Sequence, residues 1–178
     1  MKTLVGISGS LRQGSYNTAL LRAALGMAPV GWQTEVAEIR DLPLYDADLD
    51  SGSPPESAAR FRALIAGADA VLIATAEYNF SVPGGLKNAL DWGSRPQGSA
   101  PLPKKKVGVV GASPGPVGTS RAQGHLRQIL FGMGALQYPS GEVLVGLAPS
   151  KFTDGVLTDA KTQEFVAKYV AGFLGWVG

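Results

Sequence analysis

The chain alternates short, continuously apolar runs with longer segments in which apolar residues recur at helical spacing. The clearest apolar runs are KTLVGIS at residues 2–8, AVLIAT at 70–75 and VGVV at 107–110. Runs without strict polar alternation are typical of strands that are covered on both faces. Strands that alternate with helices along a chain form a parallel sheet with helices on both sides. The sequence therefore predicts an α/β fold with a doubly wound parallel sheet.

Two weaker strands, at residues 34–39 and 142–145, and five helical segments complete the expected order of five strands and five helices. The second helix is expected to begin at SPPE, residues 53–56, as a capping box with proline at the first helical position. The helical spacing itself predicts helices at the following places: residues 20–27, 61–68, the LKNALDW stretch after Pro83, 122–133, and from about residue 158 onward.

The length and composition indicate a single domain spanning residues 1–178. With 178 residues and 45% apolar side chains, the chain can bury a full core without disulfides or metal ions. It contains no cysteine, which excludes disulfides, thiol nucleophiles and thiolate metal sites and makes the cytoplasm the expected compartment. The amino end lacks the pattern of a signal peptide, and no apolar run approaches the roughly 20 residues that cross a bilayer.

The charge pattern indicates neither a nucleic-acid partner nor a membrane partner. The net charge is only +2, and the one basic run is Lys104 to Lys106. Because runs of like charge are usually solvated, this run is expected to be an exposed loop rather than a binding patch.

Ligands of an open parallel sheet bind beside the carboxyl ends of its strands, where the direction of winding reverses. Three predicted loops lie at such ends, at residues 9–17, 76–82 and 112–119, and all three are rich in Ser, Gly and Asn. These loops are therefore the candidate binding site.

The first loop has the glycine spacing of a phosphate-binding P-loop, but it lacks the residues that hold a triphosphate. Within GSLRQGSY, Ser15 and Tyr16 stand where a lysine and a Ser/Thr would be required. A dinucleotide fingerprint also fails, since the glycines do not follow G-x-G-x-x-G, although Glu38 near the end of the second strand could imitate its ribose-binding acid.

The first loop does offer donors that suit a phosphate monoester. Ser10, Arg12, Ser15 and Asn17 supply hydroxyl, guanidinium and amide groups beside the backbone N–H groups of a helix start. The alternative is an ordinary turn from strand to helix in which Ser15 or Asn17 is the cap. The loop alone does not decide between the two interpretations.

The second loop adds a flat apolar surface beside polar groups. Tyr78 and Phe80 follow the central apolar strand together with Glu77 and Asn79. Aromatic rings and amide groups can contact the face and the edge of a planar heterocycle, although such aromatics also serve as core or lid residues.

With these motifs the sequence resembles the NADPH-dependent FMN reductase family, especially its bacterial quinone and chromate reductase branch. The resemblance rests on GSLRQGSYN, EYNFSVPGGLKNALDW and RAQGHLRQIL, supported by DLPLYDADLD, and it spans nearly the whole chain. It implies a flavodoxin-like fold with a five-stranded sheet in the order 2-1-3-4-5 and bound FMN. It also implies that NADPH or NADH donates a hydride for the two-electron reduction of quinones or of similar small-molecule acceptors, such as chromate, azo compounds or flavin.

The resemblance also assigns residues to the cofactor. Ser10, Arg12, Ser15 and Asn17 are expected to contact the FMN phosphate, and Glu77 to Phe80 are expected to line the isoalloxazine ring. The full set of implied cofactor-binding residues is Ser10, Leu11, Arg12, Gln13, Gly14, Ser15, Tyr16, Asn17, Glu77, Tyr78, Asn79, Phe80 and Ser113. No residue is assigned as catalytic, since the cofactor itself carries the chemistry.

The same resemblance implies a homodimer, possibly a homotetramer. Arg121 and Glu142 match positions of the family that contact another subunit near the flavin, although each is equally well explained as an ordinary exposed charge. Ala76 replaces a usual proline and Gly124 replaces a common aromatic residue, which leaves tetramer formation and acceptor preference open. His125 is expected to be a partly buried structural histidine rather than a proton donor.

Two other classes of function stay open at this stage. A flavodoxin would carry single electrons to a protein partner, but such carriers are usually strongly acidic, whereas this chain is slightly basic. A non-enzymatic, Rossmann-like nucleotide-binding protein is supported only by the fold and by Glu38. Residues 41–55 and 93–103 are expected to frame the space for the acceptor.

Overall fold

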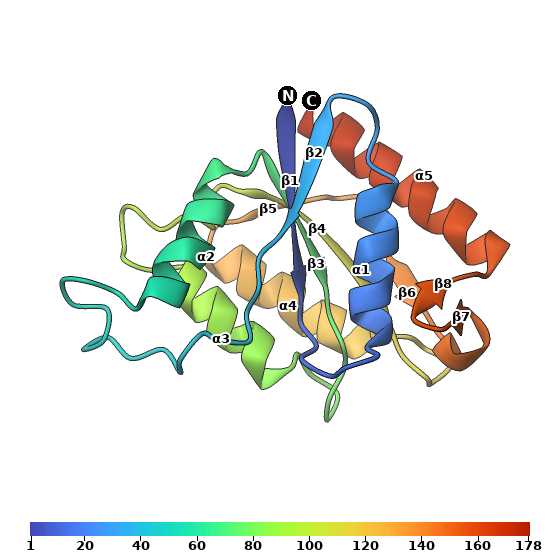
Figure 1. Ribbon diagram of the computed structural model, residues 1–178, viewed down its shortest axis with the longest axis horizontal. Coiled ribbons are helices and arrows are strands. Elements are labelled where there is room, and N and C mark those ends of the chain that lie inside the picture. The colour runs from blue at the N-terminus through green and yellow to red at the C-terminus, as the bar shows by residue number, and fades with distance from the viewer.

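The apolar runs form parallel strands at the centre of the molecule. A computed structural model describes residues 1–178, and Figure 1 shows its elements. The sheet order is β2-β1-β3-β4-β5, and all of its pairings are parallel, so the predicted order 2-1-3-4-5 is confirmed. The first four strands are β1 (Lys2–Ser8), β2 (Trp32–Val36), β3 (Ala70–Ala74) and β4 (Lys106–Ala112).

The fifth position of the sheet is shared by two short strands. β5 (Leu136–Gln137) pairs with the start of β4, and β6 (Val143–Val145) pairs with its end. The expected strand at 142–145 is therefore present, but it is only half of this position. Pro139, which has no N–H to donate, and Gly141, at φ +74°, lie between the two halves and interrupt the pairing.

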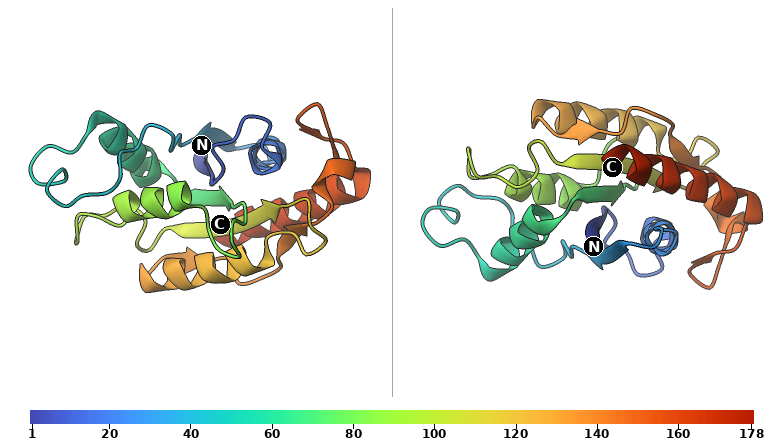
Figure 2. Two further views of the ribbon diagram at one scale, coloured as in Figure 1. Left: turned by 90° about the horizontal axis from the view of Figure 1, so that it is seen from below. Right: turned by 90° about the horizontal axis from the view of Figure 1, so that it is seen from above.

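Five helices cover the sheet, two on one face and three on the other, as seen when the molecule is viewed from its ends (Figure 2). The last helix begins at Ala160, where Asp159 caps it by accepting the Thr162 N–H. A short 3-10 helix and an antiparallel hairpin precede it and were not predicted. The elements are α1 (Tyr16–Gly26), α2 (Glu56–Gly67), α3 (Gly84–Gly93), α4 (Ser120–Gly132), α5 (Ala160–Val177), η1 (Ala148–Ser150), β7 (Phe152–Thr153) and β8 (Val156–Leu157).

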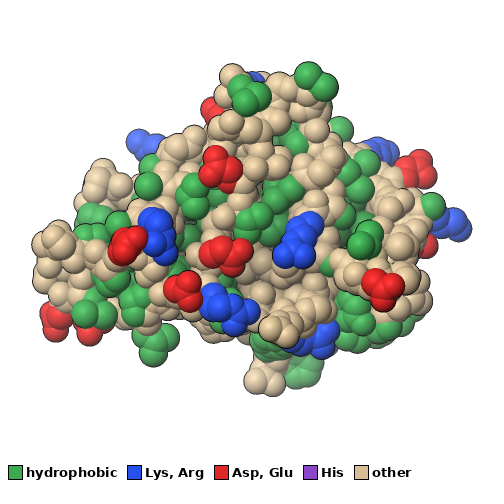
Figure 3. All heavy atoms as spheres, in the orientation of Figure 1, with side chains coloured by type: hydrophobic (Ala, Val, Ile, Leu, Met, Phe, Trp, Pro, Cys, Tyr) green, Lys and Arg blue, Asp and Glu red, His purple; other side chains and the backbone are tan.

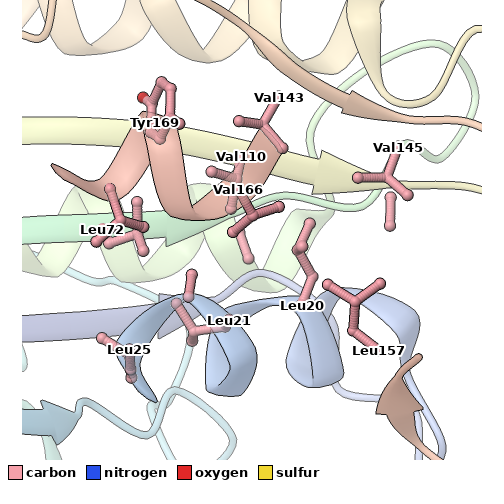
Figure 4. Packing of buried hydrophobic residues seen from close by; sticks show 14 of the residues in the cluster. Leu20, Leu21, Leu25, Leu72, Val110, Val143, Val145, Leu157, Val166 and Tyr169 are labelled. Atoms are coloured by element: carbon pink, nitrogen blue, oxygen red, sulfur yellow. The ribbon is translucent and has the colours of Figure 1, made fainter. Parts of the chain in front are cut away.

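The central strands β1, β3 and β4 send alternate side chains into two separate hydrophobic cores. Leu72 packs with α1 and α5, whereas its neighbour Ile73 packs with α2, α3 and α4. Figure 4 shows the first core, in which Leu20 and Leu21 of α1 approach Leu72 and Val110 of the sheet. Because successive side chains in a strand point to opposite faces, one sheet fixes both helical layers.

The expected capping box at residues 53–56 is wrong. The helix begins at Glu56, Pro55 precedes it, and no side chain caps its first N–H groups. Glu56 instead forms an exposed ion pair with Arg60, one turn further along the helix, at 2.7 Å. In a capping box the Glu56 side chain would have to bond to the N–H of Ser53, before the helix. Here it pairs with Arg60, four residues further along the helix.

The basic run at the start of β4 is only partly the solvated loop that was expected, because Lys104 is exposed in a turn but Lys105 and Lys106 are half-buried. The Lys105 ammonium donates to the carbonyls of Ala66 and Ala68 at the end of α2, and Lys106 donates to the Val177 carbonyl at the end of α5. Burial lowers the pKa of Lys105. Two of the three lysines thus satisfy helix C-termini, where cations are favoured by the helix dipole.

Both ends of the chain lie at the end of the molecule where β1 begins, opposite the loops that follow the strands (Figure 1). None of the helices combines the length and the apolar character that a membrane crossing requires. The loops at the carboxyl ends of β1, β3 and β4 therefore occupy an edge of the sheet that neither terminus covers.

Candidate functional site

The three candidate loops meet around one cavity of about 180 Å³ at the carboxyl edge of the sheet. This arrangement follows from the topology, because β1, β3 and β4 are neighbours and run in the same direction. The lining residues come from all three loops: Ser10, Arg12, Ser15, Tyr16 and Asn17 from the first, Ala76, Glu77 and Tyr78 from the second, and Ala112, Ser113 and Pro114 from the third.

The first loop presents a helix start with free polar groups beside it. The Ser15 hydroxyl caps α1 by accepting the N–H groups of Asn17 and Thr18 at 3.2 and 3.3 Å. Ser10 is buried at the cavity, and its hydroxyl makes no hydrogen bond within the chain. The Arg12 guanidinium donates to the Gly14 carbonyl at 3.0 Å and lies 5.7 Å from the centre of the Tyr16 ring. Ser15 is thus a cap, while Ser10 and Arg12 keep donors for a ligand.

Asn17 connects the first loop to the third. Its side-chain amide donates to the Ala112 carbonyl at 2.9 Å, and its side-chain oxygen accepts the Ala112 N–H at 2.8 Å. Because Asn17 is only 4% exposed, these two bonds are shielded from water. Asn17 therefore fixes the distance between two walls of the cavity.

Two helix N-termini face this edge of the sheet, and they differ in charge. At α4, the Glu77 carboxylate accepts the N–H groups of Arg121 and Ala122, each at 3.0 Å, so an acid of the chain itself occupies that terminus. The first turn of α1 carries no acid, and Arg12 lies beside it. The positive end of the α1 dipole thus remains available to an anion, whereas that of α4 does not.

The second loop ends in a strained two-residue turn. Tyr78 and Ser81 exchange two backbone hydrogen bonds of 3.0 Å, and the residues between them, Asn79 and Phe80, have φ values of 48° and 64°. A bulky residue such as Phe80 rarely adopts a positive φ, and such strain is concentrated at functional sites. The turn leaves the Tyr78 and Phe80 rings 51% and 64% exposed.

The turn is held against α4 by two further contacts. The Arg121 guanidinium lies 4.6 Å from the centre of the Phe80 ring, and the Ser81 hydroxyl and Nδ1 of His125 are hydrogen-bonded at 2.9 Å. His125 is exposed, so the expectation of a partly buried histidine is wrong. Its position on α4 directs it toward the second loop rather than toward the core.

Several predicted residues lie outside the cavity. Leu11, Gln13 and Gly14 line a separate hollow on the other side of the first loop, and Asn79 and Phe80 lie at the tip of the turn. Glu142 lies in a third hollow with Arg127, at 4.0 Å from it. Neither residues 41–55 nor 93–103 line the cavity.

The cavity is also lined by residues that lie in the predicted loops but were not assigned to the cofactor. These are Ala76, Ala112 and Pro114, whose small apolar side chains carry no chemical signal of their own. The contact between Ser81 and His125 joins residues 44 positions apart, a distance at which no local pattern operates.

The fold and the site define a class of protein: a flavodoxin-like α/β protein in which a helix start without an acidic residue lies next to exposed aromatic rings. Comparison with known families gives the next step, because residues 2–150 match the NADPH-dependent FMN reductase family. The chain belongs to this family.

Individual relatives agree with this assignment. An NAD(P)H-dependent FMN reductase of Pseudomonas aeruginosa is 43% identical over 98% of this chain and 94% of its own length. A quinone reductase of Pseudomonas putida is 43% identical over 96% of this chain and 92% of its own length. Among solved structures, the flavoenzyme NAD(P)H:(acceptor) oxidoreductase FerB of Paracoccus denitrificans has a TM-score of 0.89 at 36% identity, over 99% of this chain and 97% of the other.

Proposed function

We propose that this protein is an FMN-dependent NAD(P)H oxidoreductase that reduces quinones or similar small acceptors. The observation that carries the proposal is the pairing, in one cavity, of an unneutralised helix start with the exposed Tyr78 ring. The first feature suits a phosphate dianion, and the second suits a flat aromatic ring. FMN carries both groups on one molecule, and the named relatives are FMN and quinone reductases.

The size of the cavity fits this cofactor only if part of the cofactor lies outside it. A volume of about 180 Å³ is below the ~300–1,000 Å³ of typical small-molecule sites. The cavity would therefore hold the phosphate and its polyol chain, with the ring outside it near Tyr78. The lining residues agree with this placement. The free Ser10 hydroxyl and Arg12, which suit a phosphate, lie in the first loop, and Tyr78, which suits a ring, lies in the second.

Residues of the chain bind and orient the cofactor in this proposal. Ser10, Arg12 and the positive end of the α1 dipole would hold the phosphate, and Asn17 keeps the first and third loops at a fixed separation. Glu77 fixes the second loop on α4, so that Tyr78 is held in place beside the ring. The remaining residues of the cofactor set, Leu11, Gln13, Gly14, Ser15, Tyr16, Asn79, Phe80 and Ser113, shape the loops around it.

When bound, FMN would supply the chemistry, which is two-electron transfer from NADPH or NADH to the acceptor in a ping-pong sequence. The chain would contribute the position of the cofactor and leave space beside Tyr78 for the donor and the acceptor in turn. Because the cofactor would carry the reaction, the cavity does not require a pair of acid and base residues for proton transfer.

Three finer features belong to the same proposal. The acceptors are quinones first, with chromate, azo compounds and flavin as further candidates, since relatives are named for quinone reduction. The protein forms a homodimer or homotetramer in which Arg121 and Glu142 lie near the flavin of another subunit. The absence of cysteine supports a cytoplasmic location.

The direct test is an anaerobic titration of protein reconstituted with FMN. We expect NADPH or NADH to bleach the flavin absorbance without any auxiliary protein, and a quinone to restore it. Initial rates at several quinone concentrations should give parallel double-reciprocal lines. Intersecting lines would exclude the ping-pong scheme, and a flavin that NAD(P)H cannot reduce directly would favour an electron carrier instead.

A further inference from the structure

A second hollow lies on the opposite side of the first loop from the flavin cavity. It has a volume of about 390 Å³ and lies between this loop, α1 and the chain at the end of β2. Ser10, Arg12 and Ser15 border both spaces, so the two lie back to back across the loop. Nothing in the proposed flavin chemistry uses this hollow.

Four charged side chains line this hollow without pairing with one another. Arg12, Arg22 and Arg40 provide three guanidinium groups, and Glu38 provides one carboxylate. None of them takes part in any ion pair of the chain, although they border the same space. The side chains of Arg22 and Glu38 make no hydrogen bond within the chain, whereas Arg12 and Arg40 each donate to one backbone carbonyl, of Gly14 and of Leu11. The hollow is therefore net positive and keeps donors and an acceptor for a ligand.

An apolar floor separates these charges. Leu21 of α1 is buried there, and Val36, Ala37 and Ile39 at the end of β2 complete the floor. On the face of the molecule that carries β2 and α1, a strip of hydrophobic atoms lies between acidic and basic side chains (Figure 3). A ligand with an apolar body and polar groups of both kinds would match this distribution.

The position of Glu38 narrows the class of ligand. In dinucleotide-binding α/β folds, an acid at the end of the second strand accepts hydrogen bonds from a ribose hydroxyl. Glu38 follows β2 in the same way, but the glycines of the fingerprint are missing, and the start of α1 is assigned to the FMN phosphate. A phosphate in the second hollow must therefore contact the arginine side chains, which suit phosphate oxygens because each offers several donors.

We propose that this hollow binds a ribonucleoside phosphate, with its ribose diol on Glu38, its phosphate against Arg22 and Arg40, and its base on the apolar floor. The volume lies near the lower end of the range for small-molecule sites, so it holds one nucleoside phosphate rather than a whole dinucleotide. The ligand is either a free nucleotide or the nucleotide half of the hydride donor.

The test is a calorimetric titration of the FMN-loaded protein with AMP. We expect one AMP to bind per chain, and the substitutions Arg22→Gln and Glu38→Gln each to weaken it about tenfold, as expected for loss of one charged hydrogen bond. Arg60→Gln and Glu35→Gln are the matched controls, because these residues line a different hollow beside β2. Neither control should change the affinity for AMP.

A deoxy analogue tests the role assigned to Glu38. The wild-type protein should bind 2′-deoxy-AMP more weakly than AMP, and Glu38→Gln should remove that preference. Competition then identifies the source of the ligand. AMP competes with NAD(P)H if the nucleotide half of the hydride donor occupies the hollow, and it binds without raising the KM for NAD(P)H if a free nucleotide does.

The proposal is overturned if AMP at millimolar concentration does not bind saturably to the FMN-loaded protein. It is equally overturned if Arg22→Gln and Glu38→Gln leave the affinity unchanged, or if AMP and 2′-deoxy-AMP bind alike. The flavin absorbance of the same samples reports FMN binding independently. Failure of the second site is thus distinguishable from failure of the flavin site.

Discussion

Glu77 is the residue that couples the second loop to the helix behind it. Its carboxylate accepts two N–H groups at the start of α4, so Glu77→Ala should lower the free energy of unfolding by about 1–2 kcal/mol, the usual cost of losing a helix cap. Urea unfolding of the FMN-free protein measures this. Glu56→Ala, at the exposed start of α2, should cost only a few tenths of a kcal/mol. Equal losses in the two variants would show that Glu77 is not a cap.

Asn17 has a structural task that its loop neighbours lack. Asn17→Ala removes both hydrogen bonds to Ala112 and leaves that buried backbone donor and acceptor unsatisfied, which should cost about 2–4 kcal/mol. Gln13→Ala, an exposed change in the same loop, should cost less than about 0.5 kcal/mol. Urea midpoints of the two variants compare them directly. A small loss in Asn17→Ala would mean that water replaces the lost amide.

At the scale of elements, an ion pair fixes the long connection between β2 and α2. Arg62 of α2 contacts both carboxylate oxygens of Asp50 at 2.7 Å, and the two side chains are only 13% and 7% exposed. The hydrogen bonds from Arg62 lower the pKa of Asp50 below its ordinary value of 3.8. Residues 41–55 are thereby bound to the helical layer rather than free above the sheet edge.

This lowered pKa gives stability a definite pH dependence. The folded state favours the ionised Asp50, so its contribution is fully present above the ordinary pKa and is lost as the pH falls through the lowered one. The difference in unfolding free energy between the wild type and Asp50→Asn should be constant from pH 7 to about pH 5 and should shrink below about pH 4. Urea unfolding across this range measures it.

The control for that experiment is a second ion pair, with the same distance between its charged atoms but with more exposed side chains. Asp91 contacts Lys87 one turn away at 2.7 Å, with side chains 39% and 47% exposed. Asp91→Asn should change stability by no more than about 0.5 kcal/mol at any pH. An Asp50→Asn difference that stays the same at pH 3 and pH 7 would contradict the assigned role of the ion pair.

Elements whose signals are local were predictable from the sequence, and those set by distant partners were not. The strands at residues 2–8 and 70–75 were predicted because burial on both faces requires unbroken apolar runs. The split of the fifth strand was missed, since pairing of β5 and β6 with β4 depends on register rather than on propensity. The hairpin of β7 and β8 has only two residues in each strand, too few to show a period.

The same division holds for the candidate site. The three loops were predicted because each follows an apolar strand, and the topology brings such ends together. The contacts of their side chains were not predictable. Asn17 is hydrogen-bonded to Ala112, 95 residues away in the sequence, and Glu77 accepts a hydrogen bond from Arg121 at the start of α4, 44 residues away. The sequence thus indicated which loops meet at the cavity, while the fold determines which of their side chains already bond to other parts of the chain.

At the scale of the whole molecule, the two cores share one sheet and should unfold together. Leu72 and Ile73 are neighbours in β3 and enter different cores, and both are fully buried. Leu72→Ala and Ile73→Ala should each lower the free energy of unfolding by about 3 kcal/mol. In both variants the transitions followed by circular dichroism and by tryptophan fluorescence should coincide. Separate transitions in either variant would show that the helical layers unfold independently.

The central claim is that the first loop binds a phosphate monoester that carries a flat ring. The most direct measurement is the affinity of the protein for FMN and for riboflavin, which lacks the phosphate, in the wild type and in Arg12→Gln. We expect FMN to bind much more tightly than riboflavin, and Arg12→Gln to weaken FMN about tenfold while leaving riboflavin unchanged. Equal affinities for FMN and riboflavin in the wild type would contradict the account.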